Sequence, residues 1–205
     1  HYTQDPEFRA YAFFLMVISL LVIAALLYFG IFASAGDAII NGLFQAVSIG
    51  TTAGFTTAEF YNWPGFIAIL LLFTSFVGGC AGSTGGGMKV IRFLLLFKQG
   101  VREIRRLVHP SALIPIKIGG KPVQDRVMDA VWGFFAAYVA LFSIMLLILM
   151  ATGLDQITAF SAVAACMNNL GPGLGEVGSN YEGLSDLAKW VLTFAMLLGR
   201  LEIFT

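Results

Sequence analysis

The stretch AYAFFLMVISLLVIAALLYFGIF, at residues 10–32, contains no charged side chain. As an α-helix it would extend about 34 Å, which is enough to cross the hydrocarbon core of a bilayer. It is too long for the apolar core of a signal peptide, and no small-residue cleavage pattern follows it. We therefore expect a membrane-spanning helix here.

Further apolar stretches follow along the chain, at residues 130–151 and 184–205, and 29 uncharged residues separate Glu59 from Lys89. Glycines interrupt that last stretch, which is longer than one span. Together these segments predict four crossings. Only 12% of the 205 residues are charged and 58% are hydrophobic, whereas a soluble domain is about 25% charged. This composition excludes a soluble enzyme and a disordered chain.

The net charge is zero, with twelve basic and twelve acidic side chains, but their distribution is uneven. Nine of the twelve basic residues lie between residues 89 and 126. The positive-inside rule makes this region cytoplasmic. Acidic residues dominate the opposite loops, with Lys189 as the basic exception: Asp37, Glu59, Asp155, Glu176, Glu182 and Asp186. Both ends of the chain are then expected on the cytoplasmic side.

Two short apolar segments, residues 37–49 and 155–167, would be helices of only about 20 Å, which suits re-entrant segments better than crossings. Each begins with an aspartate that can cap the helix. A glycine-containing turn follows each segment, with Gly54 seventeen residues after Asp37 and Gly171 sixteen residues after Asp155. The order span, short helix, glycine turn, span thus occurs twice in the same direction, which predicts parallel repeats.

Non-helical backbone at membrane depth is tolerated where it is packed in protein or lines a water-filled cavity. Rings of backbone carbonyls can replace the hydration shell of a cation, and glycine permits the backbone angles that align them. The turns therefore suggest a cation path. The alternative is a pair of hairpin loops that only pack the helix bundle.

The glycine-rich residues 78–87 lack the Gly-Lys-Ser/Thr ending of a phosphate-binding loop. Gly78 and Gly82 satisfy the G-x-x-x-G spacing of close helix packing. A glycine run inside a span more readily unwinds it, and Ser83 and Thr84 could then satisfy the freed backbone groups. A helix over residues 90–108 would continue into the cytoplasm.

Four motifs together resemble the Trk/Ktr/HKT superfamily of cation transporters, most closely its bacterial Trk potassium-uptake membrane subunits. They are TTAGFTT at residues 51–57, GGCAGSTGGGMK at 78–89, NNLGPGLG at 168–175 and GRLE at 199–202. The resemblance implies an all-α integral membrane fold of potassium-channel-like repeats, of which this chain holds the third and fourth of four. Residues 1–108 would form the third repeat, 109–128 a cytoplasmic connector, and 129–205 the fourth. Because the chain begins at His1 and stops at Thr205 inside an apolar run, we expect it to be a segment of a longer polypeptide.

The resemblance also implies site residues. The filter would comprise Thr51, Thr52, Ala53, Gly54 and Phe55 with Asn169, Leu170, Gly171, Pro172 and Gly173. Potassium would bind at Thr52, Gly54, Asn169 and Gly171. The gate would comprise Gly78, Gly79, Gly82, Ser83, Thr84, Gly85, Gly86, Gly87 and, at mid-depth in the last span, Arg200. An arginine there would raise a barrier to cations.

The implied function is potassium (K⁺) uptake across the bacterial inner membrane, with no organic cofactor and no nucleic-acid partner. The implied partners are the first two repeats of the same pore, a second copy in a homodimer, a cytosolic nucleotide-binding regulatory ring and the lipid bilayer. The sequence leaves open K⁺ against Na⁺ preference, and channel-like conduction against proton-coupled symport. A non-conducting membrane scaffold or regulatory subunit is the alternative function.

An enzyme is not expected. Asp37 and Asp155 faintly resemble the aspartates of intramembrane proteases, but that chemistry needs two carboxylates close enough to share a proton. Both aspartates here open short helices, where capping explains them. Cys80 and Cys166 lie in apolar surroundings, which argues against a disulfide scaffold or a zinc site.

Overall fold

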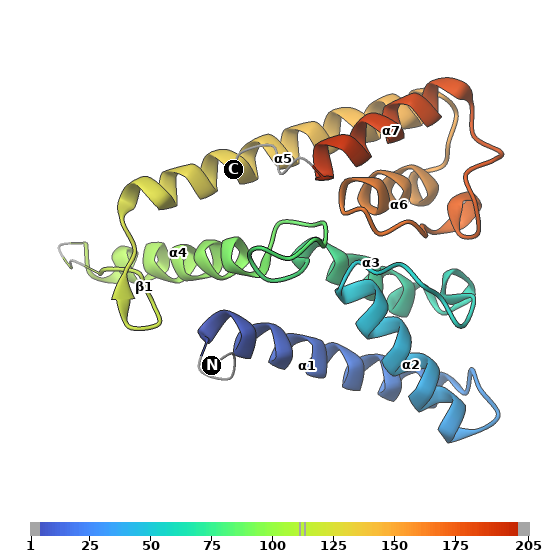
Figure 1. The fold of residues 1–205 in the computed structure, drawn as a ribbon, viewed down its shortest axis with the longest axis horizontal. Helices are drawn as coiled ribbons and strands as arrows, with labels where there is room; N and C mark the ends of the chain where they lie inside the picture. Colours follow the sequence, from blue (N-terminus) through green and yellow to red (C-terminus); the bar gives the residue numbers. More distant parts are fainter. Residues whose placement is uncertain (1–4, 111, 113, 201–205) are drawn as a thin grey trace.

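The computed structural model describes residues 5–110, 112 and 114–200, and its regular secondary structure there is helical apart from one two-stranded hairpin. Figure 1 shows two groups of helices, with α1 (Pro6–Phe29), α2 (Ala35–Gly50) and α3 (Gly65–Val77) on one side. The other group is α5 (Asp125–Ala151), α6 (Gln156–Met167) and α7 (Asp186–Arg200). The long helix α4 (Val90–Val108) lies between the groups at one end of the molecule.

Two of the described helices are long and apolar enough to cross a membrane, namely α1 and α5. Asp5 caps α1, Pro6 occupies its first turn, and Gly30 ends it with a left-handed φ of 61°. Large apolar side chains on these helices face outward, such as Phe13 at 63% and Leu147 at 65% exposure. Such a surface suits contact with lipid.

The other two expected crossings differ from a single long helix. Helix α3 has only 13 residues, about 20 Å, and ends at Gly78, whose φ is 68°. The chain then runs without helix to α4, whose bounds match the predicted residues 90–108. Helix α7 has 15 described residues, and the last part of the expected span and of the GRLE motif lies outside the described residues.

The short helices form where the sequence predicts them, but one cap was assigned wrongly. Asp155 caps α6 and accepts hydrogen bonds from the N–H groups of Ile157 and Thr158. At α2 the cap is Ser34 rather than Asp37, and its hydroxyl accepts from the Gly36 N–H at 3.1 Å. Serine caps as well as aspartate does, and Asp37 instead lies within the first turn, near the positive end of the helix dipole.

The segment predicted as a connector, residues 109–128, contains a small hairpin. Strands β1 (Lys117–Ile118) and β2 (Lys121–Pro122) pair antiparallel. Gly119 and Gly120 form the turn with positive φ at both positions, as tight hairpins require. Helix α5 begins at Asp125, four residues before the expected boundary at 129.

Two buried clusters hold the helices together. The first joins α1, α2 and α3 around the fully buried Phe60 of the short helix η2 (Phe60–Asn62), and it extends to Ala164 and Ala165 of α6. The second joins α5, α6 and α7. Phe76 and Phe142 pack against both clusters. The two helix groups therefore share one continuous apolar contact through α3, α5 and α6.

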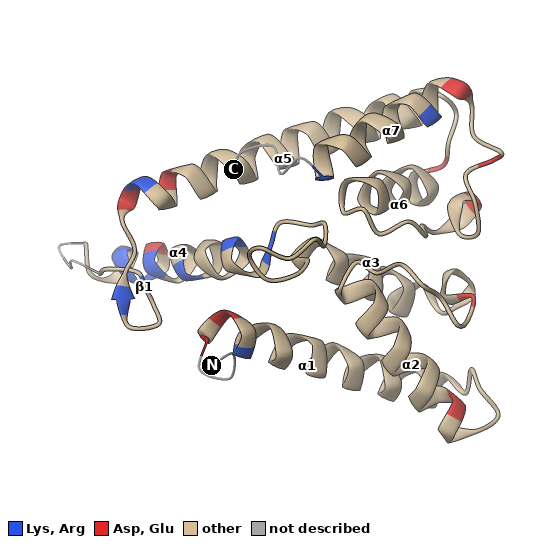
Figure 2. Cartoon of the chain, in the orientation of Figure 1, with Lys and Arg blue, Asp and Glu red and all other residues tan. Residues whose placement is uncertain are grey.

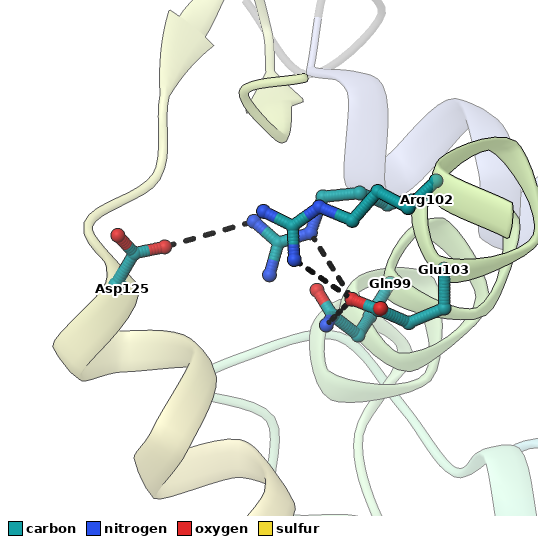
Figure 3. Close-up of polar contacts among 5 residues, drawn as sticks. Gln99, Arg102, Glu103 and Asp125 are labelled. Atoms are coloured by element: carbon teal, nitrogen blue, oxygen red, sulfur yellow. Dashed lines mark hydrogen bonds and ion pairs between the residues drawn. The ribbon is translucent and has the colours of Figure 1, made fainter. Parts of the chain in front are cut away.

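Charged side chains gather mainly at one end of the molecule, over α4, β1 and the start of α5 (Figure 2). There Arg102, whose side chain is 11% exposed, lies 3.7 Å from Glu103 and 3.6 Å from Asp125 (Figure 3). Gln99 donates a hydrogen bond to the same Glu103 carboxylate at 2.6 Å. This network connects α4 to the first turn of α5, so Arg102 is a structural ion-pair residue.

Candidate functional site

The chain reverses direction immediately after α2, in what we call the first turn (residues 51–55). Thr52 has a φ of 56° and Gly54 a φ of 77°. The N–H of Ala53 donates to the Ser48 carbonyl at 2.8 Å, and the Ser48 hydroxyl donates to the Phe55 carbonyl at 2.6 Å. Ser48, near the end of α2, thus restrains the first turn through two hydrogen bonds, one with its carbonyl and one with its hydroxyl.

The chain reverses in the same way after α6, in the second turn (residues 168–173). Asn169 has a φ of 51° and Gly171 a φ of 101°. The Leu170 N–H donates to the Ala165 carbonyl at 2.8 Å, which repeats the bond from Ala53 to Ser48. By hydrogen bonding and dihedral angles, Asn169 corresponds to Thr52 and Gly171 to Gly54.

The two turns lie against each other. A Cβ atom added to Gly54 would stand 2.0 Å from the carbonyl oxygen of Leu170, so a side chain at Gly54 has no room. Within the described residues, the carbonyl oxygens of Thr52, Ala53, Gly54, Asn169 and Leu170 accept no hydrogen bond. Unpaired carbonyls at adjacent turns are available as cation ligands.

A glycine loop (residues 78–89) lies directly against both turns. The Gly86 N–H donates to the Thr52 hydroxyl at 2.9 Å. A Cβ atom on Gly86 would lie 1.8 Å from the Asn168 carbonyl oxygen, and one on Gly85 would lie 3.0 Å from the Thr52 hydroxyl. The structure therefore brings the predicted gate glycines into contact with residues of both predicted filter segments.

Two charged side chains that were not among the predicted gate residues hold the glycine loop in place. Lys89 is buried, and its ammonium donates to the carbonyls of Ser83 and Gly85 at 2.7 and 2.6 Å. Glu7, at the start of α1, accepts from the Ala81 N–H at 2.7 Å. The side chains expected to satisfy the unwound backbone were those of Ser83 and Thr84, but Thr52, Lys89 and Glu7 make these contacts.

Arg200 reaches the glycine loop from the end of α7. Its guanidinium donates to the Thr84 carbonyl. The preceding Gly199 packs so closely on α6 that an added Cβ would lie 2.0 Å from the Met167 carbonyl oxygen. Arg200 and the loop, which are predicted to form one gate although they are far apart in the sequence, are therefore in contact.

The remaining predicted residues surround this centre. Gly78 and Gly87 approach each other within the loop, both with positive φ, and Gly79 packs on the Ser83 side chain, whereas Gly82 faces open space.

The remaining predicted filter residues lie at the edges of the two turns. Phe55 is 73% exposed, and the Thr51 hydroxyl donates to the Val47 carbonyl at 2.8 Å. The Gly173 N–H donates to the Val177 carbonyl at 3.0 Å, and Pro172 lines an open cavity of about 530 Å³. The same cavity is lined by Gly54, Gly171, Glu59 and Tyr181.

Asn168 was quoted within a motif but not predicted as a site residue. It is fully buried, accepts from the Tyr138 hydroxyl at 2.7 Å and donates to the Ser75 hydroxyl at 2.9 Å. These bonds connect the second turn to both α5 and α3. The sequence did contain a signal for this role. An asparagine that directly follows an apolar helix is in a position to be buried, and a buried side-chain amide requires hydrogen-bond partners.

Tyr181 was also missed. It lies after the short helix η3 (Gly175–Val177), and its hydroxyl donates to the Gly171 carbonyl at 2.6 Å. Burial raises the pKa of Tyr181, so its hydroxyl remains protonated and available as a donor. Nothing in the sequence pattern indicated this contact.

The two long apolar helices and the paired turns, which pack against the glycine loop, define a helical membrane protein. A family model described as a cation transport protein, TrkH, matches residues 11–205. The chain therefore belongs to the TrkH family of cation transport proteins, and its resemblance to the Trk superfamily is confirmed.

Two related proteins and one crystal structure support this family assignment. The chain is 58% identical over 205 residues to the Trk system potassium uptake protein TrkH of Vibrio parahaemolyticus, and this covers 100% of the chain and 42% of the relative. It is 41% identical over 201 residues to TrkG of Escherichia coli, covering 98% of the chain and 41% of that protein. The crystal structure of the potassium transporter TrkH from Vibrio parahaemolyticus matches with a TM-score of 0.93 at 58% identity, over 99% of this chain and 43% of that one. The chain thus spans less than half the length of these relatives.

Proposed function

We propose that this chain supplies two of the pore-forming repeats of a potassium uptake protein in the bacterial inner membrane. The observation that carries the proposal is the contact between Gly54 and the Leu170 carbonyl, which places two carbonyl-bearing turns side by side. The chain's family is a family of cation transport proteins, and the relatives described above are named for potassium uptake or transport. The remaining length of those relatives leaves room for the rest of the pore.

In this proposal the two turns are filter segments that bind K⁺ through backbone carbonyls at Thr52, Gly54, Asn169 and Gly171. Three of these carbonyls accept no hydrogen bond within the described residues, and that of Gly171 accepts one from Tyr181 but has a second lone pair. Such oxygens can replace the water shell of an entering ion. The carboxyl ends of α2 and α6 lead directly into the turns, and the partial negative charge of a helix carboxyl end favours a cation there. The cavity of about 530 Å³ beside Gly54 and Gly171 is the outer mouth.

The glycine loop and Arg200 form the gate. The loop lies against the inner ends of both turns through Gly85 and Gly86, and the Arg200 guanidinium fixes it at Thr84. A positive charge at this depth opposes the passage of a cation. Movement of the loop away from the turns would open the path.

The basic end of the molecule is cytoplasmic in this orientation, including residues 90–126, while Lys89 is buried in the glycine loop. The first two repeats of the same pore complete the ring of carbonyls, since two segments surround only half of an ion. A homodimer and a cytosolic nucleotide-binding regulatory ring are the proposed partners, with the ring at the cytoplasmic end.

The test is K⁺ flux into liposomes that contain the full-length protein. Arg200→Ala should raise the flux, because it removes both the positive charge and the contact with the Thr84 carbonyl. Arg200→Lys retains the charge and serves as the matched control, with flux close to that of the unaltered protein. Unchanged flux in the alanine variant would reject the gating role.

Growth of a potassium-uptake-deficient strain separates transport from the scaffold alternative. Rescue at low external K⁺ by the full-length gene supports transport. A correctly folded protein that does not rescue growth would favour a non-conducting scaffold or regulatory subunit.

A further inference from the structure

The two proposed filter glycines have different surroundings. Gly54 and Gly171 occupy corresponding places in the first and second turns, yet within the described residues the Gly54 carbonyl accepts no hydrogen bond. The Gly171 carbonyl accepts one from the Tyr181 hydroxyl at 2.6 Å. One of the two otherwise similar turns therefore has a side-chain donor on its filter glycine.

The second turn lacks one hydrogen bond that the first turn has. In the first turn, Ser48 accepts from Ala53 through its carbonyl and donates to Phe55 through its hydroxyl. The corresponding residue of α6 is Ala165, which accepts from Leu170 but has no hydroxyl to donate. In addition, Pro172 has no N–H, so the residue after Gly171 cannot anchor the turn through its own amide.

The space where a side chain of Gly171 would lie is open, unlike that at Gly54. A Cβ atom added to Gly171 would meet nothing within 4 Å, whereas one added to Gly54 would collide with Leu170. Gly171 also has a φ of 101°, in a region that only glycine enters readily. The Pro172 ring fixes the φ that follows this peptide, so rotation about ψ of Gly171 is the freedom left to its carbonyl, and the Tyr181 hydroxyl restrains it.

Tyr181 is well placed to provide that restraint. It packs against the buried cluster of α5, α6 and α7. It lines both the cavity of about 530 Å³ beside Gly54 and Gly171 and a second one of about 360 Å³ beside Asn169 and Leu170. The Tyr181 ring thus packs beside the second turn, and its hydroxyl donates a hydrogen bond to the Gly171 carbonyl.

We propose that Tyr181 is a positioning residue that sets the ion selectivity of the second turn by fixing the direction of the Gly171 carbonyl. This inference rests on the proposed function of the turns as filter segments. A carbonyl oxygen has two lone pairs, so one can accept from Tyr181 while the other faces the ion. Without the hydroxyl, the carbonyl rotates and adapts to the smaller Na⁺, and discrimination against Na⁺ falls.

The test uses the full-length protein in liposomes and compares K⁺ with Na⁺ flux at fixed pH and membrane potential. Tyr181→Phe removes only the hydroxyl and should lower the K⁺/Na⁺ flux ratio about fivefold, the change expected for loss of one hydrogen bond. Tyr28→Phe removes a hydroxyl from a side chain that is 84% exposed on α1, and this control should leave the ratio unchanged.

An unchanged or higher ratio in Tyr181→Phe overturns the inference when the unaltered protein is itself K⁺-selective. If the unaltered protein shows no preference for K⁺, the proposed function of the turns fails first. A second measurement covers the case in which the variant conducts poorly. K⁺ should protect the unaltered protein in detergent against thermal unfolding better than Na⁺ does, and Tyr181→Phe should lose this difference; retention of the difference also overturns the inference.

Discussion

Replacing Gly86 with alanine tests whether the glycine loop is held closed by its contact with the second turn. Gly86 is buried and has no positive φ, so alanine introduces only a steric conflict there. The new Cβ would lie 1.8 Å from the Asn168 carbonyl oxygen, and real contacts of this kind stay above 3.0 Å. The loop and the turn must therefore separate by at least the difference, 1.2 Å.

This separation penalises the closed arrangement and disturbs the 2.9 Å hydrogen bond from Gly86 to Thr52. Overpacking of a well-packed site costs about 1–3 kcal/mol. A bias of that size changes the ratio of two conformations about 5- to 150-fold. Since the penalty applies to the closed loop, we expect basal K⁺ flux to rise at least about fivefold.

The assay is K⁺ flux into liposomes with equal amounts of folded full-length protein, checked by size-exclusion chromatography. Gly85→Ala is the matched control, because its Cβ would lie 3.0 Å from a side-chain oxygen, that of Thr52, and a shift of a few tenths of an ångström accommodates it. Its flux should stay within about twofold of the unaltered protein. Equal flux in the Gly86→Ala variant and the unaltered protein would refute the reasoning, and so would an equal rise in both variants.

Two further predictions concern stability. Asn168→Ala leaves the Tyr138 and Ser75 hydroxyls without their partner, so we expect a loss of about 2 kcal/mol or more and a lower thermal unfolding temperature in detergent; an unchanged temperature would contradict the anchoring role. Asp155→Ala removes the cap of α6 and should cost about 1 kcal/mol at neutral pH. Hydrogen bonds from Thr158 and Ile157 hold the pKa of Asp155 below 3.8, so this contribution is complete above that pH and is lost as the pH falls through the lowered pKa. The difference in unfolding temperature between Asp155→Ala and the unaltered protein should therefore shrink as the pH is lowered through this pKa, and a difference that stays the same on acidification would show another origin.

The helices were predictable because their signals are local. An uncharged apolar run predicts α1, the end of the glycine run marks where α4 begins, and an aspartate before an apolar segment predicts the cap of α6. The predicted cap of α2 was wrong because serine and aspartate are both good capping residues, and Ser34 lies only three positions before Asp37. The contacts between the glycine loop and the turns were not readable from the residues themselves, because they join backbone atoms far apart in the sequence.

The missed residues share one physical reason. Asn168, Tyr181 and Glu7 act through side-chain hydrogen bonds to other segments of the chain. Periodicity and composition report which face of a helix is apolar, but they do not report which hydroxyl or carboxylate meets which backbone group across the fold. The family resemblance identified the glycines and Arg200 as candidate site residues, whereas only the structure showed which side chains hold them in place.

The most direct test of the central claim is the ratio of K⁺ to Na⁺ flux through the full-length protein in liposomes, at fixed pH and membrane potential. If adjacent carbonyl-bearing turns form the filter, K⁺ enters faster than Na⁺, and a side chain at Gly54 abolishes this preference because it has no room beside Leu170. Equal flux of both ions through the folded protein, or a preference that survives Gly54→Ala, would contradict the account.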